Sequence, residues 1–259
     1  MSVITSRGNP RVRRWRELMR DARERRSQRR AMIEGENLLS AFLRSEQTVE
    51  NLILSKTGSS RNEFIALAKH SGKTPTVLAD AVFRTIVDVA EPSGIAAEIA
   101  IPPGARGLGI APCCVFLEGI QDAGNVGAIL RSAAAFGIRH AVLGRGCADV
   151  WSPKVLRAAA GAHFTMQLAE SADLATAIGN FGGKTVCTVP RGGIGLSAAV
   201  LSGRIGWILG TEGKGASDAL AARATLKVTI PMPGGAESLN VAAAAAICFY
   251  EFSRRGALA

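Results

Sequence analysis

The sequence has few of the residues that build disulfide frameworks and zinc sites. Five cysteines and three histidines stand among 259 residues, and none of the cysteines belongs to a CxxC pair. No histidine lies at zinc-ligand spacing from a cysteine. An odd, scattered set of cysteines is typical of reduced thiols in a protein core. We therefore expect neither a structural disulfide nor a metal site.

Long hydrophobic runs are also absent. The apolar run at residues 241–249 is shorter than the roughly 18 residues that a transmembrane helix needs, and it ends at Tyr250 and Glu251. The N-terminus carries arginines without an apolar segment behind them, so it does not resemble a secretory signal. These absences argue against a membrane protein or a secreted protein, and we expect a cytoplasmic chain.

Acidic residues are scarce at the start of the chain, where positive charge is concentrated. The formal charge of the chain is +10, and residues 1–30 hold eleven arginines against three acids. Such a local field attracts polyanions, and nucleic acid is the leading candidate. An anionic membrane fits less well because the segment lacks the apolar face of a surface-seeking helix. A solvated, partly disordered arm is the alternative interpretation. We expect phosphate contacts from Arg11, Arg13, Arg14, Arg16 and Arg20.

Helices and strands alternate in the first part of the chain. The pattern predicts an arginine-rich helix over residues 9–30, with Trp15, Leu18 and Ala22 on its narrow apolar face. Further helices are expected at residues 33–43, 62–70 and 80–87, the last capped by Asp80. Strands are expected at residues 49–54, 76–78 and 95–101. This alternation predicts a small α/β domain over residues 1–101, followed by a proline- and glycine-rich linker at residues 102–112.

Apolar strands alternate with helices again in residues 113–259. Strands are expected at residues 114–117, 141–143, 164–168, 185–189, 205–209 and 226–230. Helices are expected at residues 125–136, 153–160, 172–178 and 238–252, the second of them with Ser152 as its cap and Pro153 in its first turn. Continuous apolar strands between helices predict a second domain with a parallel sheet that is covered on both faces.

Three glycine-rich segments follow predicted strands of this sheet and lead into helices. They span residues 118–137, 208–217 and 230–246. Ligands of parallel α/β sheets bind beyond the carboxyl ends of the strands, where glycine lets the backbone approach them closely. A nicotinamide dinucleotide fits poorly, because GxGxxG is missing and only Asp149 stands loosely within range of the acidic position. The P-loop pattern GxxxxGK[ST] does not occur.

Taken in order, these segments resemble the three signature motifs of the SpoU/TrmH family of RNA 2′-O-ribose methyltransferases, in the SPOUT superfamily. The first motif corresponds to Asn125, Gly127 and Arg131. The second corresponds to Leu209, Gly210, Glu212 and Gly213, and the third to residues 230–232 and 238–241. Residues 153–164 also resemble the family. The second motif departs from the family at Thr211, where an asparagine is common.

The first part of the chain resembles the small ribosomal-protein-like RNA-binding domain that precedes many family members. This resemblance rests on Asn9, the arginine-rich segment and the residues IEG at 33–35. It implies that residues 1–101 bind the RNA substrate, whereas residues 113–259 form the methyltransferase domain.

The resemblance implies a C-terminal α/β domain with a deep trefoil knot, which is a rare exception to unknotted chains. It also implies S-adenosylmethionine as the cofactor, and a homodimer whose active site lies near the dimer interface. The cofactor-binding residues that it implies are Thr188, Leu209, Gly210, Gly213, Ile230, Met232, Ser238 and Leu239.

The resemblance further implies catalytic roles for Arg131, Asn125, Glu212, Ser238 and Asn240. Arg131 is expected nearest to the reacting hydroxyl. A guanidinium keeps its proton at neutral pH, so we expect Arg131 to polarise the 2′-oxygen and to clamp an adjacent phosphate. Asn125 would orient Arg131 or the ribose, and Glu212 would pair with Arg131 or support the cofactor loop. Ser238 and Asn240 would hold substrate and cofactor. Taken singly, Asn125 and Ser238 could be no more than helix N-caps.

The implied function is methylation of a ribose 2′-hydroxyl in structured RNA. Ribosomal RNA is favoured over transfer RNA, because an N-terminal domain of this kind usually accompanies family members that act on ribosomal RNA. The alternatives are a transfer RNA 2′-O-methyltransferase and a non-catalytic RNA-binding protein with the same fold.

Overall fold

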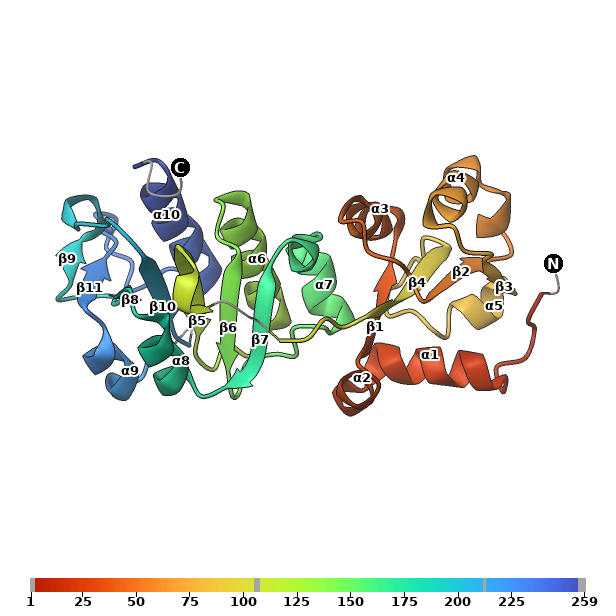
Figure 1. The fold of residues 1–259 in the computed structure, drawn as a ribbon, viewed down its shortest axis with the longest axis horizontal. Coiled ribbons are helices and arrows are strands. Elements are labelled where there is room, and N and C mark those ends of the chain that lie inside the picture. The colour runs from red at the N-terminus through yellow and green to blue at the C-terminus, as the bar shows by residue number, and fades with distance from the viewer. Residues whose placement is uncertain (1–2, 105–107, 212, 256–259) are drawn as a thin grey trace. The chain divides into compact units, whose positions relative to one another are not determined.

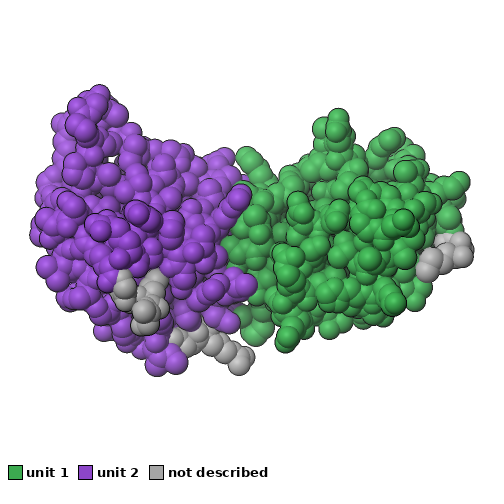
Figure 2. Space-filling model, turned by 90° about the horizontal axis from the view of Figure 1, so that it is seen from above, with its two compact units in different colours: residues 1–103, 151–164 green, residues 104–150, 165–259 purple. Residues whose placement is uncertain are grey.

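The computed structural model describes residues 3–104, 108–211 and 213–255. The chain forms two compact units (Figure 2). Unit 1 consists of residues 1–103 and 151–164, and unit 2 consists of residues 104–150 and 165–259. Each unit has its own β-sheet and its own hydrophobic core.

Unit 1 is built on a four-stranded mixed sheet with the order β1-β4-β2-β3 (Figure 1). The strands are β1 (Arg30–Glu34), β2 (Asn51–Ser55), β3 (Thr76–Leu78) and β4 (Ile95–Ala100). Strand β4 is antiparallel to β1 and β2, whereas β2 and β3 are parallel. The helices are α1 (Pro10–Arg20), α2 (Ala22–Gln28), α3 (Glu36–Arg44), α4 (Asn62–Ser71), α5 (Asp80–Phe83) and α7 (Pro153–Ala159), with 3₁₀ turns η1 (Gly58–Ser60) and η3 (Ala162–Phe164). Helices α1 and α5 lie on one face of the sheet, and α3 and α4 on the other.

Local signals in the sequence set the start and the end of α1. The Asn9 side chain accepts a hydrogen bond from the backbone N–H of Arg11, and Pro10 occupies the first turn. The helix ends at Asp21, whose backbone is extended and whose side chain caps α2. The helix predicted over residues 9–30 is therefore two helices, because Asp21 is a better cap than a helix interior residue.

The apolar face of α1 is buried against the sheet. Val12, Trp15, Leu18 and Met19 are all buried, and they join a core with residues of α5 and of all four strands. Their spacing is that of one helix face, so the arginines between them point elsewhere. The interpretation of this segment as a solvated arm is wrong, because its apolar face forms part of the core of unit 1.

Glu98, in the middle of β4, is a buried carboxylate with 1% of its surface exposed. It accepts hydrogen bonds from the Arg14 guanidinium at 2.8 and 2.5 Å, from Trp15 Nε1 at 3.0 Å and from Asn51 Nδ2 at 2.8 Å. Arg30 lies 3.8 Å away. These partners come from three different elements, so Glu98 ties α1 to the sheet. Arg14, one of the expected phosphate contacts, is thereby engaged inside unit 1.

Further predictions for unit 1 are corrected by the structure, among them the helix expected at residues 80–87, which ends at Phe83. The helix expected at residues 33–43 begins only at Glu36, because residues 30–34 form β1 in register with β4. Gly35, with a φ of 102°, makes the turn between strand and helix. Asp80 does not cap α5: the cap is Ala79, and the Asp80 carboxylate accepts hydrogen bonds from the backbone N–H and hydroxyl of Thr57, both at 3.0 Å.

Unit 2 holds a seven-stranded sheet with the order β7-β6-β5-β10-β8-β11-β9, and all of its neighbouring strands are parallel. The strands are β5 (Cys113–Leu117), β6 (His140–Gly144), β7 (Gln167–Ala172), β8 (Lys184–Thr188), β9 (Ile194–Gly195), β10 (Ile205–Leu209) and β11 (Leu226–Thr229). The helices are α6 (Ala123–Ala135), α8 (Leu174–Phe181), α9 (Asp218–Arg223) and α10 (Val241–Ser253), with 3₁₀ turns η2 (Leu108–Ile110) and η4 (Leu196–Ala198).

Helices cover both faces of this sheet. Helices α6 and α10 lie on one face, and α8 and α9 on the other (Figure 1). Successive residues of β10 accordingly meet different helices. Ile208 packs in the core formed with α8 and α9, whereas Trp207 packs against Phe249 and Phe252 of α10. The prediction of a parallel sheet buried on both faces is confirmed.

The sequence missed or shifted several elements of unit 2. Helix α9 has six residues and β9 has two, which is too short for a periodic pattern. The strand expected at residues 164–168 begins at Gln167, after a 3₁₀ turn at 162–164. Helix α10 begins at Val241 and not at residue 238.

Residues 151–164 belong to unit 1 by their contacts, although the predicted boundary assigned them to the C-terminal domain. Helix α7 packs against β1, and the Phe164 ring meets the Phe42 ring edge to face at 5.0 Å. As predicted, Ser152 caps α7, with Pro153 in its first turn. The order of elements along the sequence does not reveal that this segment packs with unit 1 while the residues on either side of it belong to unit 2.

The apolar run at residues 241–249 lies in α10, where it packs on the sheet. Within the described residues, every helix is too short or too polar to cross a membrane.

Replacing Glu98 by alanine should destabilise unit 1, because the Trp15 indole and the Arg14 guanidinium would lose their acceptor. Removing one partner of a buried ion pair typically costs about 3–5 kcal/mol. Arg14 reaches solvent, so we expect the lower end of this range, measured as the free energy of unfolding in urea. The control is Glu63→Ala, which removes an exposed ion pair with Arg61 and should cost less than about 1 kcal/mol. Equal losses in the two variants would contradict this account of Glu98.

Candidate active site

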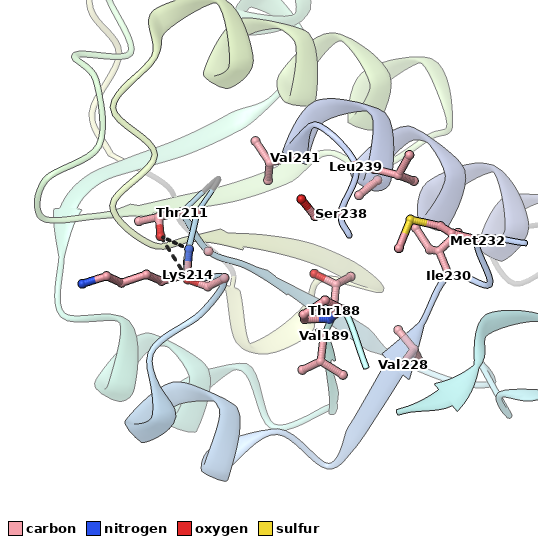
Figure 3. A pocket seen from close by; sticks show the side chains of 15 residues that line it. Thr188, Val189, Thr211, Lys214, Val228, Ile230, Met232, Ser238, Leu239 and Val241 are labelled. Carbon is pink, nitrogen blue, oxygen red and sulfur yellow. Dashed lines mark hydrogen bonds between the residues drawn. The ribbon is translucent and has the colours of Figure 1, made fainter. Parts of the chain in front are cut away.

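Three loops of unit 2 meet at the carboxyl ends of β8, β10 and β11 and enclose a pocket (Figure 3). Because the three strands are parallel neighbours, their carboxyl ends lie at one edge of the sheet. The described residues that line the pocket are Thr188, Val189, Pro190, Gly210, Thr211, Gly213, Lys214, Gly215, Val228, Ile230, Met232, Ser238, Leu239, Val241 and Ala244.

The loop after β10 folds back on itself in a tight turn. Thr211 and Gly215 exchange both backbone hydrogen bonds, at 3.0 and 2.8 Å. The Thr211 hydroxyl also accepts from the backbone N–H of Lys214 at 3.4 Å and donates to the Gly215 carbonyl at 3.3 Å. The threonine found where an asparagine is common therefore closes this turn with its own side chain.

Gly210 allows the start of this loop to pass against its end. A Cβ atom at Gly210 would lie 2.1 Å from backbone atoms of Gly215 and Ala216. A side chain at this position is excluded unless the loop opens. Gly213, in the same loop, would carry a Cβ atom in open space. The two glycines of the motif thus serve different purposes, and only Gly210 is required by close packing.

The segment after β11 supplies the apolar part of the pocket. In Figure 3, the Ile230 and Met232 side chains lie at one end of the pocket, whereas Thr211 and Lys214 lie at the other end, with Ser238 between them. Asn240 follows and caps α10, because its side chain accepts from the backbone N–H groups of Ala242 and Ala243.

The first motif lies beside this segment. Asn240 Nδ2 donates a hydrogen bond of 3.0 Å to Asn125 Oδ1, which joins the first turn of α6 to the start of α10. Asp122, and not Asn125, caps α6. Ser238 does not cap α10 either, so the interpretation of Asn125 and Ser238 as mere helix caps is wrong. Arg131 is exposed on α6.

The structure therefore brings together most of the predicted cofactor residues. Seven of the eight line the one pocket: Thr188, Gly210, Gly213, Ile230, Met232, Ser238 and Leu239. Leu209 is fully buried at the end of β10, just below them. Of the predicted catalytic residues, Ser238 lines the pocket, Asn125 and Asn240 are hydrogen-bonded to each other, and Arg131 is not among the lining residues of its own chain. Glu212 lies outside the described residues.

Sequence reasoning missed several lining residues. They are Val189, Pro190, Thr211, Lys214, Gly215, Val228, Val241 and Ala244. Most of them stand inside or next to the motifs, so the positions of the motifs in the sequence could have identified them. Val189 and Pro190 follow β8, whose carboxyl end becomes part of the pocket only through its place beside β10 and β11.

The described lining is apolar with few charges. Lys214 is its charged residue, and Figure 3 shows the Lys214 chain extending away from the Ile230 and Met232 side chains. Val228, Ile230, Met232 and Leu239 offer an apolar surface, while closely packed backbone at Gly210 offers polar groups. This combination suits a flat heterocycle with a polar edge, such as the adenine of S-adenosylmethionine.

The described lining contains no Asp, Glu or His that could act as a base. Cys187, next to Thr188 on β8, is a weak candidate because burial raises the pKa of its thiol to about 11. A proton acceptor for chemistry in this pocket therefore has to come from outside the described lining. Across the described parts of the chain, no group of three His, Cys, Asp or Glu side chains could hold a metal ion.

Comparisons with known proteins give a consistent result. The SpoU rRNA Methylase family matches residues 112–250, and the MRM3-like substrate binding domain matches residues 9–97. The 23S rRNA (guanosine(2553)-2′-O)-methyltransferase RlmP of Bacillus subtilis is 30% identical over 253 residues, which cover 96% of this chain and 98% of that protein.

Solved structures resemble the whole chain as well. An RNA 2′-O ribose methyltransferase is 28% identical, with a TM-score of 0.80, over 98% of this chain and 99% of its own. An AdoMet-bound rRNA methyltransferase from Sinorhizobium meliloti is 26% identical, with a TM-score of 0.84, over 100% of this chain and 99% of its own.

Gly210→Ala should weaken binding in the pocket, because the new methyl group would force the loop away from Gly215. We expect at least about a tenfold loss of S-adenosylmethionine affinity, the effect of roughly 1.4 kcal/mol, measured by titration calorimetry. Gly179→Ala in α8 is the control, since its Cβ atom meets no neighbour and the residue does not line the pocket, and it should bind within about twofold of the unchanged chain. If both variants bound equally well, close packing at Gly210 would not shape the site.

Proposed function

The chain belongs to the SpoU rRNA methylase family, and from this premise we propose that it methylates a ribose 2′-hydroxyl of ribosomal RNA. It is an enzyme, and its cofactor is S-adenosylmethionine. The observation that carries the proposal is the convergence of the three motif segments at one edge of the sheet, where two of them line a pocket and the third is hydrogen-bonded beside it.

The pocket residues bind and orient the cofactor. When bound, S-adenosylmethionine supplies an electrophilic methyl group on a sulfonium. Ile230, Met232 and Leu239 would form the apolar surface that keeps water from the adenine, and the backbone of the loop at Gly210 would offer it polar groups. Such positioning can contribute several kcal/mol, up to about 7–11, toward the barrier of a two-substrate reaction.

Arg131 acts on the ribose. Its guanidinium polarises the 2′-oxygen and clamps an adjacent phosphate, and an oxygen of that phosphate takes the proton that the hydroxyl loses. The absence of Asp, Glu and His from the described lining supports an acceptor on the substrate itself. Asn125 and Asn240 keep α6 and α10 together and hold the ribose, and Ser238 positions substrate against cofactor. Glu212 supports the cofactor loop.

Two chains form a homodimer through α6 and α10, so that Arg131 of one chain works beside the pocket of its partner. The exposed position of Arg131 outside the lining of its own pocket supports this arrangement. Exposed apolar residues of α10 support it too: Ile247 is 40% exposed, and Tyr250 is 56% exposed beside Phe136 of the α6 end.

The two parts of the chain have separate tasks. Residues 1–101 bind RNA, residues 102–112 link the two parts, and residues 113–150 and 165–259 carry the reaction. The loops after β10 and β11 belong to a deep trefoil knot, and the chain works in the cytoplasm, where ribosomal RNA is available. Within the first part, Arg13 and Arg20 are exposed and Arg16 is half-buried on α1, which supports their contact with phosphates.

Arg131→Ala should abolish methyl transfer and leave cofactor affinity within a few fold, because Arg131 acts on the ribose and lies on α6, apart from the loops that line the pocket. The measurement is transfer of tritium from labelled S-adenosylmethionine to ribosomal RNA, with transfer RNA as the comparison substrate. Arg139→Ala, another exposed arginine of unit 2, is the control and should keep full activity. An active Arg131→Ala variant would contradict the role assigned to Arg131. If the unchanged chain bound RNA without binding the cofactor, it would be a non-catalytic relative.

The double variant Arg13→Gln/Arg20→Gln should weaken RNA binding and flatten its dependence on salt. Loss of two phosphate contacts lowers the slope of log affinity against log salt by about one to two. Arg44→Gln/Lys69→Gln removes the same charge from exposed positions on α3 and α4, across the sheet from α1, and serves as the control. Equal slopes for the two double variants would show that α1 is not the RNA surface.

A further inference from the structure

We infer that Glu118 is a positioning residue, which holds the loop after β10 in the shape that binds the cofactor. Glu118 follows β5 directly, at the start of the segment that carries the first motif, and it is not among the described lining residues of the pocket. The inference rests on the proposed function, because it concerns the same pocket.

The Glu118 side chain is hydrogen-bonded to the end of the loop. Its two carboxylate oxygens accept hydrogen bonds from the backbone N–H and from the hydroxyl of Ser217, both at 2.7 Å. Ser217 in turn caps α9, since its hydroxyl oxygen accepts from the backbone N–H of Leu220 at 3.3 Å. Hydrogen bonds to an ionised acceptor are shorter and stronger than neutral ones, so this contact fixes where the loop ends.

The Glu118 backbone is hydrogen-bonded to the start of the same loop. Its N–H group donates to the Leu209 carbonyl at 2.9 Å, which extends the pairing of β5 with β10 by one residue. One residue therefore holds both ends of the segment between Leu209 and Ser217. Inside the segment, the paired Thr211 and Gly215 close the turn.

Gly119 shows how closely the two segments are packed. It has a φ of 63°, and a Cβ atom there would lie 3.2 Å from Cγ2 of Thr211. The chain after β5 thus passes directly against the loop that lines the pocket. Three residues later, Asp122 caps α6, the helix that carries Arg131. Glu118 therefore links the position of the cofactor loop to the start of the catalytic helix.

Two physical roles for a carboxylate at this place make different predictions. A positioning residue needs two hydrogen-bonding atoms at the right distance, and glutamine retains them: its amide oxygen accepts from the Ser217 N–H, and its amide nitrogen donates to the Ser217 hydroxyl oxygen. A residue that attracts the positive sulfonium needs the negative charge, which glutamine lacks. The geometry favours the first role, because both carboxylate oxygens are already engaged with Ser217.

The test compares Glu118→Ala, Glu118→Gln and a control, Asp173→Ala. Asp173 caps α8 in the same unit and likewise accepts from backbone N–H groups and from a hydroxyl, that of Thr176. By calorimetry, E118A should bind S-adenosylmethionine about five- to tenfold more weakly, as expected for the loss of a charge-assisted contact. E118Q should keep most of the affinity, within about threefold of the unchanged chain, because glutamine keeps both contacts and loses only their charge assistance, and D173A should be unaffected. In methyl transfer, the defect of E118A should be in the KM for cofactor and not in kcat.

Hydrogen exchange on the protein without ligand gives a second readout that does not depend on the cofactor. The amides of Thr211, Gly215 and Ser217 should exchange faster in E118A than in D173A, because the loop loses its anchor. The inference would be overturned if E118Q bound S-adenosylmethionine as weakly as E118A does. It would also be overturned if these amides exchanged at an unchanged rate in E118A. An unchanged chain that fails to bind S-adenosylmethionine while E118A still loosens the loop would instead refute the proposed function and leave the anchoring role in place.

Discussion

The parallel register of β8, β10 and β11 is the constraint on which the pocket depends. Ile208 pairs with Cys187, and Val228 pairs with Thr188, so the three strands end at nearly the same height in the sheet. The loops that follow must then share one small volume, although more than 40 residues of chain separate Thr188 from Ile230. Burial of β10 on both faces, with Trp207 under α10 and Ile208 under α8 and α9, holds this register in place.

Within that shared volume, the shape of the pocket depends mainly on contacts of the backbone. Gly210 permits two stretches of main chain to touch, Thr211 closes the turn, and Glu118 anchors its ends. A loop that is already closed loses less conformational entropy when a ligand binds than a loose one does. Among the described lining residues only Lys214 is charged, so the pocket offers a ligand mainly its shape and its fixed backbone groups.

The positive surface of unit 1 follows from a different constraint. Helix α1 must bury Val12, Trp15, Leu18 and Met19, so arginines at the remaining positions are turned outward. Arg14 and Arg11 are exceptions. Glu98 accepts hydrogen bonds from the Arg14 guanidinium in a buried network with Trp15, and the Arg11 guanidinium donates to Asn51 Oδ1 at 3.3 Å and to Thr76 Oγ1 at 2.7 Å. The same helix therefore forms one side of the core and presents a basic surface.

The sequence by itself determined the alternation of strands and helices in both units, the buried parallel sheet, and the three motifs, two of which hold most of the pocket residues. These are local patterns, namely apolar runs, caps such as Asn9 and Ser152, and glycines at fixed offsets. Only the tertiary structure decided that residues 30–34 pair with β4 as a strand, that residues 151–164 join unit 1, and that Glu118 reaches Ser217. Each of these depends on contacts between residues far apart in the chain, up to 99 positions in the last case, and such contacts leave no periodic signal in a single sequence.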